Sequence, residues 1–91
     1  MASFIAPMKS PGSLLDYGID WTELLEEGET VDSADWSISG ATLAQNRIDG
    51  NVTVAWVDGG ESGYKAKLTC KMTTSVGRIY ERTILIPVRQ R

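Results

Sequence analysis

Apolar and polar residues alternate along four stretches of the chain, and this alternation predicts β-strands. In the longest stretch the apolar residues share one parity and the polar residues the other; these are Tyr64, Ala66, Leu68, Cys70 and Met72 against Lys65, Lys67, Thr69 and Lys71. The three shorter stretches carry Trp36 and Ile38; Val52, Val54 and Trp56; and Ile84, Ile86 and Val88. Strands with one apolar face are stable when those faces pack together, so the pattern predicts a β-sandwich with these residues inside.

Further elements complete this picture. Tyr17, Ile19 and Trp21 alternate with polar residues and predict a first strand. A short helical turn follows it, because Asp20 and Glu23 form a capping-box pattern and Gly28 supplies a stop; its carboxylates Glu26, Glu27 and Glu29 are expected outside. Further strands are expected over residues 31–38, 42–48, 51–57, 64–74 and 79–89. The fold class is therefore all-β: a single immunoglobulin-like β-sandwich of about seven antiparallel strands.

The first fourteen residues differ from the rest. They contain Pro7, Pro11 and Gly12 and show no sustained periodicity, so we expect an extended N-terminal docking arm over residues 1–14 and the sandwich domain over residues 15–91. The apolar residues of the arm, Phe4, Ile5 and Met8, would gain by docking into a groove on a partner. The alternative is that the arm folds back over its own sandwich.

Composition limits the possible functions. The chain has 91 residues, which is the length of one domain, and a formal net charge of −3, which disfavours a broad nucleic-acid footprint. It contains one cysteine and no histidine. An internal disulfide is therefore impossible, and the commonest general base and metal ligand is missing. No apolar run approaches the length of a membrane span, and no secretory signal is visible, so we expect folding in a cytoplasm.

Three groups of residues are candidates for a chemical site. The carboxylates Glu26, Glu27 and Glu29 indicate a solvated turn rather than an acid–base pair, which needs burial or opposed environments. The acids Asp49, Asp58 and Glu61 lie in glycine-rich turns but match no calcium loop spacing. The loop 59–63 lacks the lysine and helix of a phosphate-binding loop. We expect no catalytic residue, no metal, no cofactor and no small-molecule substrate, so the protein is not predicted to be an enzyme.

Several segments together resemble a known family. These are LDYGIDW (15–21), GETV (28–31), Trp36, the long segment 56–78 and ERTILIPV (81–88). A lysine-and-proline segment, Lys9-Ser10-Pro11, precedes the first of them. From Lys9 onward the chain resembles small tailed-bacteriophage virion proteins of the fiber–tail adaptor family. Asp58 stands where a serine is more usual in that family, and the first eight residues have no counterpart.

The resemblance implies a virion structural protein, assembled in the bacterial host cytoplasm. Its partners would be other phage virion proteins, namely tail, neck or fiber components, bound by multiple copies in a symmetric ring without nucleic acid or membrane. We expect partner binding by two groups, the arm residues Phe4, Ile5, Met8, Lys9 and Pro11 and the arginines Arg82, Arg89 and Arg91. The open alternatives are a capsid decoration or collar protein and a carbohydrate- or surface-binding adsorption module.

Overall fold

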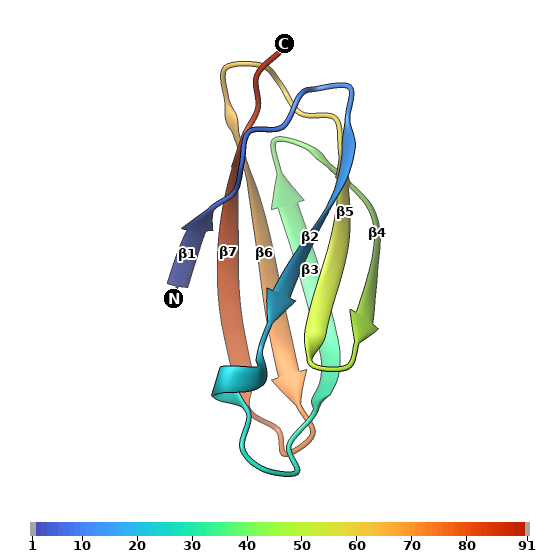
Figure 1. Ribbon diagram of the computed structural model, residues 1–91, viewed down its shortest axis with the longest axis vertical. Helices are drawn as coiled ribbons and strands as arrows, with labels where there is room; N and C mark the ends of the chain where they lie inside the picture. Colours follow the sequence, from blue (N-terminus) through green and yellow to red (C-terminus); the bar gives the residue numbers. More distant parts are fainter. Residues whose placement is uncertain (1, 91) are drawn as a thin grey trace.

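In the part of the chain that the structure describes, seven strands form two facing sheets (Figure 1). The computed structural model describes residues 2–90, and the side chains of residues 5–90. The elements are β1 (Ala2–Ile5), β2 (Leu14–Asp20), the 3-10 turn η1 (Thr22–Leu24), β3 (Val31–Ser39), β4 (Thr42–Asp49), β5 (Val52–Asp58), β6 (Lys65–Thr74) and β7 (Ile79–Pro87). The all-β prediction is confirmed, and each expected strand is present to within a few residues.

The larger sheet has the order β1-β7-β6-β3 and the smaller has the order β2-β5-β4. Among the strands of residues 2–90, β1 runs parallel to β7 and the other pairings are antiparallel. The expectation that all strands are antiparallel is wrong at this point. The chain leaves β1 on one sheet and crosses over the end of the sandwich to begin β2 on the other, as Figure 1 shows.

The core lies between the inner faces of β5, β6 and β7. Strand β6 contributes most of the alternating set that the sequence predicts, and Ala66, Leu68, Cys70 and Met72 are all fully buried. Tyr64, which precedes the strand, is 64% exposed, so its predicted inward position is wrong. Trp21 is also fully buried, and its indole Nε1 donates a 2.9 Å hydrogen bond to Thr53 Oγ1. This bond satisfies the polar atom of a large buried side chain, which would otherwise cost stability.

The predicted inner face of β5 is wrong. Thr53, Ala55 and Val57 face the core, and Val52, Val54 and Trp56 therefore lie on the outer face. Outside the sandwich, the Arg47 guanidinium lies 5.0 Å from the centre of the Trp56 ring. Because β5 is the central strand of its sheet and is apolar at both parities, its alternation does not identify the inward side.

A close backbone approach occurs where β3 turns into β4. Gly40 has φ +83°, and a Cβ atom there would lie 3.2 Å from Ala66 Cα and 3.3 Å from the Lys65 carbonyl oxygen. Both neighbours are backbone atoms of β6, which cannot rotate away as a flexible side chain would. Only glycine fits this combination of dihedral angle and space.

We predict that Gly40→Ala lowers the free energy of unfolding by about 2–3 kcal/mol, because it adds a steric clash to the cost of positive φ. Gly28→Ala is the matched control, since Gly28 has φ +82° and no atom within 4 Å of the added Cβ. The control should cost only about 1 kcal/mol. Urea unfolding of both variants measures the difference, and equal losses would contradict the packing argument.

Candidate docking surfaces

The N-terminal arm lies along the edge of its own larger sheet. Beyond the β1–β7 pairing, Ala6 N–H donates to the Leu85 carbonyl and Lys9 N–H donates to the Pro87 carbonyl, each at 2.8 Å. Arg89 N–H then donates to the Lys9 carbonyl at 2.9 Å. The chain therefore adopts the fold-back arrangement, and the arm covers part of an edge that would otherwise expose unpaired backbone groups.

Lys9 is a buried anchor within the arm. Its side chain is fully buried, and its ammonium donates hydrogen bonds to the carbonyl oxygens of Ser10 at 3.0 Å, Gly59 at 2.7 Å and Ser13. Burial lowers the pKa of Lys9 from its ordinary value, and the nearby Asp58 carboxylate partly opposes this. The ammonium joins the arm, the start of β2 and the β5–β6 loop. A partner contact by Lys9 stays a prediction, and it would require these bonds to open.

The other arm residues are more accessible. Ile5 is 69% exposed, Met8 is 36% exposed and Pro11 is half-buried. The backbone of Phe4 pairs with Ile84, while the Phe4 side chain lies outside the described part of the structure. Two apolar side chains of the arm are therefore available to a partner while the arm stays on β7.

The predicted arginine group is not brought together. Arg82 points toward the interior edge of the sandwich, where its guanidinium lies 5.0 Å from the centre of the Trp21 ring. Arg89 is exposed beyond the end of β7. At the usual rise of a strand, the seven residues from Arg82 to Arg89 span roughly 23 Å. Arg91 lies outside the described residues. Arg82 packs within its own domain, and Arg89 remains on the surface.

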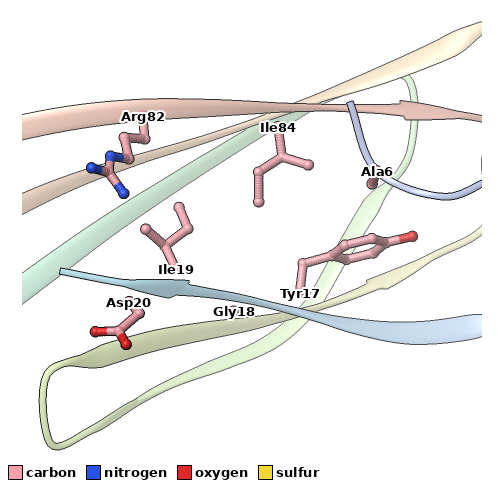
Figure 2. Close-up of a pocket in the computed structure, with 7 residues that line it drawn as sticks. All are labelled: Ala6, Tyr17, Gly18, Ile19, Asp20, Arg82 and Ile84. Atoms are coloured by element: carbon pink, nitrogen blue, oxygen red, sulfur yellow. The ribbon is translucent and has the colours of Figure 1, made fainter. Parts of the chain in front are cut away.

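A groove opens between the free edge of β2 and strand β7, on the side where the arm passes (Figure 2). It has a volume of about 340 Å³ and is lined by Ala6, Tyr17, Gly18, Ile19, Asp20, Arg82 and Ile84. Its walls are mostly apolar, and Figure 2 shows Asp20 and Arg82 together at one end. Such a groove suits an apolar side chain with a polar neighbour. Sequence reasoning missed it, although Gly18 within a strand is a signal for close backbone approach.

Tyr17 stands at the other end of this groove (Figure 2). Its hydroxyl is buried and has no hydrogen-bond partner within the described part of the chain. Burial raises the pKa of Tyr17, and the neighbouring Asp16 carboxylate raises it further. The phenol is therefore neutral at ordinary pH.

The acidic turn differs from its prediction. Glu29 is buried, with 7% of its surface exposed, so the expectation that it lies outside is wrong. Its Oε1 accepts a 2.8 Å hydrogen bond from Glu26 N–H, and Arg78 Nε lies 4.0 Å from its Oε2. Arg78 also contacts the Glu26 carboxylate at 3.2 Å. These contacts join the turn to the β6–β7 hairpin and give Glu29 a structural role.

Within residues 2–90, no three or more cysteine, aspartate or glutamate side chains gather as ligands for a metal ion. In the same residues no helix has the length and apolar character needed to cross a membrane. The cysteine thiol of Cys70 is buried, and its burial raises its pKa.

The fold and its surfaces define a small all-β protein with the features of a structural binding module. The family described as podophage GP4 fiber-tail adaptor protein gp77 matches residues 9–87, and the chain belongs to this family. The resemblance to the fiber–tail adaptor family is therefore confirmed, and the family gives the chain a role as a phage structural adaptor, a class that is typically non-enzymatic. A comparison with curated proteins finds no match.

We predict that Lys9→Met lowers the free energy of unfolding by about 2–3 kcal/mol, because it leaves buried carbonyl oxygens without their donor. Lys67→Met is the control, since Lys67 is exposed on the outer face of β6, and it should change stability by less than about 0.5 kcal/mol. Chemical denaturation of the purified variants gives both values. A neutral Lys9→Met variant would show that the anchor does not contribute to stability.

The burial and hydrogen bonds of Glu29 lead to a separate prediction on the pH dependence of stability. Hydrogen bonds from Glu26 N–H and the Thr74 hydroxyl lower the pKa of Glu29 from its ordinary value of 4.5. The unfolded chain therefore binds the proton more readily, and the stability that Glu29 contributes is present above pH 4.5 and lost as the pH falls through the lower folded pKa.

Thermal unfolding measured between neutral and acidic pH tests the direction in which the stability contributed by Glu29 changes. The decrease in melting temperature toward acid should be smaller in Glu29→Gln than in the wild type. It should not vanish, because Asp20 also has a lowered pKa through hydrogen bonds from Thr22. Parallel pH profiles of the two proteins would contradict the role assigned to Glu29.

Proposed function

We propose that the protein is a non-enzymatic virion component that joins tail or neck components to fibers or other virion parts. Its contacts are made by the N-terminal arm and by the sheet surfaces. The proposal extends the family role by naming the parts of this chain that bind. Assembly takes place in the host cytoplasm, and the chain then remains in the particle.

The observation that carries the proposal is that the arm has an open strand edge beside an exposed apolar side chain. Strand β1 has only four residues, pairs with a single neighbour and leaves its other edge open. Ile5 is largely exposed beside that edge. An open strand edge with an exposed apolar side chain can accept a strand from a partner, which is a common mode of protein recognition.

The immunoglobulin-like assignment is part of the same proposal. In that fold two sheets contain strands B-E-D and C-F-G when the strands are lettered in chain order. The order β2-β5-β4 and the neighbouring set β3-β6-β7 have the same arrangement. Strand β1 would then correspond to the first strand, paired with the last strand instead of the second. This rigid frame would present the arm and the loops in a fixed orientation.

Multiple copies would bind in a symmetric ring around the tail. The arm contact and a sheet contact are both small, and repetition around an axis would convert weak single contacts into firm attachment. The carbohydrate-binding alternative has less support, because Trp21 is fully buried and Trp36 and Trp56 are half-buried.

We predict that a chain lacking residues 2–8 is lost from phage particles while its domain stays folded. This truncation keeps Lys9, so the anchor and the β5–β6 loop are retained. The measurements are quantitative mass spectrometry of purified particles and circular dichroism of the purified chain.

The double variant Ile5→Ser with Met8→Ser tests the exposed arm residues directly and should also reduce incorporation. Its control is Leu14→Ser, since Leu14 is 55% exposed but lies outside the segment removed. Normal incorporation of the truncated chain would refute the docking role of the arm.

A further inference from the structure

The outer face of the smaller sheet carries an apolar stripe. Val52, Val54 and Trp56 point away from the core along β5, and Val54 is only 8% exposed. The outward residues of a sandwich are usually polar. Val54 is paired with Gly18 on one side and with Arg47 on the other, and it is already covered within its own domain, so the accessible apolar surface of this stripe comes from the half-buried Val52 and Trp56. This face is therefore more apolar than a surface strand requires.

Acidic side chains border the stripe. Asp16 and Asp20 share this outer face on β2, and Asp49 shares it on β4. Arg47 stacks on Trp56 and lies 3.9 Å from Asp49. Because the acids outnumber this one arginine, the face combines an apolar centre with a negative rim.

The larger sheet carries a complementary outer face. Lys65 and Lys67 point outward from β6 and are paired with Pro87 and Leu85 of β7. The arm adds Ile5, which pairs with Leu85 and shares its face. This end of the face is apolar and positively charged. At the other end Lys71 is placed between Asp35 and Glu81 by the strand register, so its charge is balanced locally.

We propose that the outer face of the smaller sheet binds the outer face of the larger sheet on a second copy of the chain. The apolar stripe would pack against Leu85 and Ile5, while Asp16 and its neighbours would pair with Lys65 and Lys67. The two surfaces are different, so the contact is head-to-tail. A head-to-tail contact repeats from copy to copy and closes into a ring when the rotation allows. This inference rests on the proposed function, because it identifies the contact between copies that would build the proposed ring.

The size of the outer face of the smaller sheet sets the expected strength of the contact between two copies. Three strands at ~4.8 Å spacing and about seven residues at ~3.4 Å each give roughly 14 by 24 Å. That is smaller than the surface that a standard stable interface covers, which is about 800 Å² on each partner. Each contact is therefore weak and should depend on concentration and on ionic strength.

Sedimentation analysis of the purified full chain tests the proposal. Between about 10 µM and 1 mM, a range suited to a small interface, the average mass should rise with concentration at low salt and fall back when salt is added. Asp16→Lys and Lys67→Glu should each weaken self-association by about tenfold or more, because each places like charges against each other.

The decisive sample is an equimolar mixture of the two variants. Each altered face then meets an opposite charge on the other variant, so association should return. The chain that carries both substitutions should also associate. The matched control is Glu27→Lys, which makes the same charge change at an exposed site in the turn outside both faces.

A wild type that stays monomeric throughout would overturn the proposal, as would a mixture that fails to recover. Unchanged association of the single variants would overturn it too. Asp16→Lys and Lys67→Glu leave the arm intact, so self-association of these variants is measured separately from the docking role of the arm, which incorporation of the arm variants into particles tests. A chain that enters virions but does not self-associate would refute only this contact.

Discussion

The buried Lys9 ammonium is the interaction on which the arrangement of the arm depends. A charge removed from water is costly unless hydrogen bonds compensate for it, and here backbone carbonyls of Ser10, Ser13 and Gly59 do so. One side chain thus fixes the end of the arm, the approach to β2 and the loop between β5 and β6. The backbone N–H of Lys9 also donates to the Pro87 carbonyl, so the arm stays beside β7, along which β1 runs parallel. The arm can then present its exposed apolar residues from a fixed base.

Some of this fold could be predicted from the sequence. Strand β6 was predicted with its correct inner face because polar side chains occupy every second position of it. Strand β5 was assigned the wrong face, because its inner side carries Thr53 and Ala55 and its outer side carries larger apolar residues. On the inner side the Thr53 hydroxyl accepts a hydrogen bond from the Trp21 indole, and no local pattern in the sequence records that contact.

The candidate site was harder to predict for the same reason. The partners of Lys9 are backbone atoms, and one of them belongs to Gly59, fifty residues away. Residue type alone cannot identify a buried lysine whose acceptors are carbonyls. Strand β1 has too few residues for a periodicity, and Glu29 is buried by a turn that closes onto the β6–β7 hairpin. The family match begins at Lys9, so it includes the anchor and the sandwich but not the preceding arm.

The most direct test of the account is the copy number of this protein in the virion, measured by quantitative mass spectrometry against the major capsid protein. A head-to-tail ring on the tail or neck axis predicts a value of about six or twelve copies. A value on the order of hundreds would place the protein on the capsid shell as a decoration or collar protein and contradict the ring. Absence from purified particles would contradict a structural role in the virion.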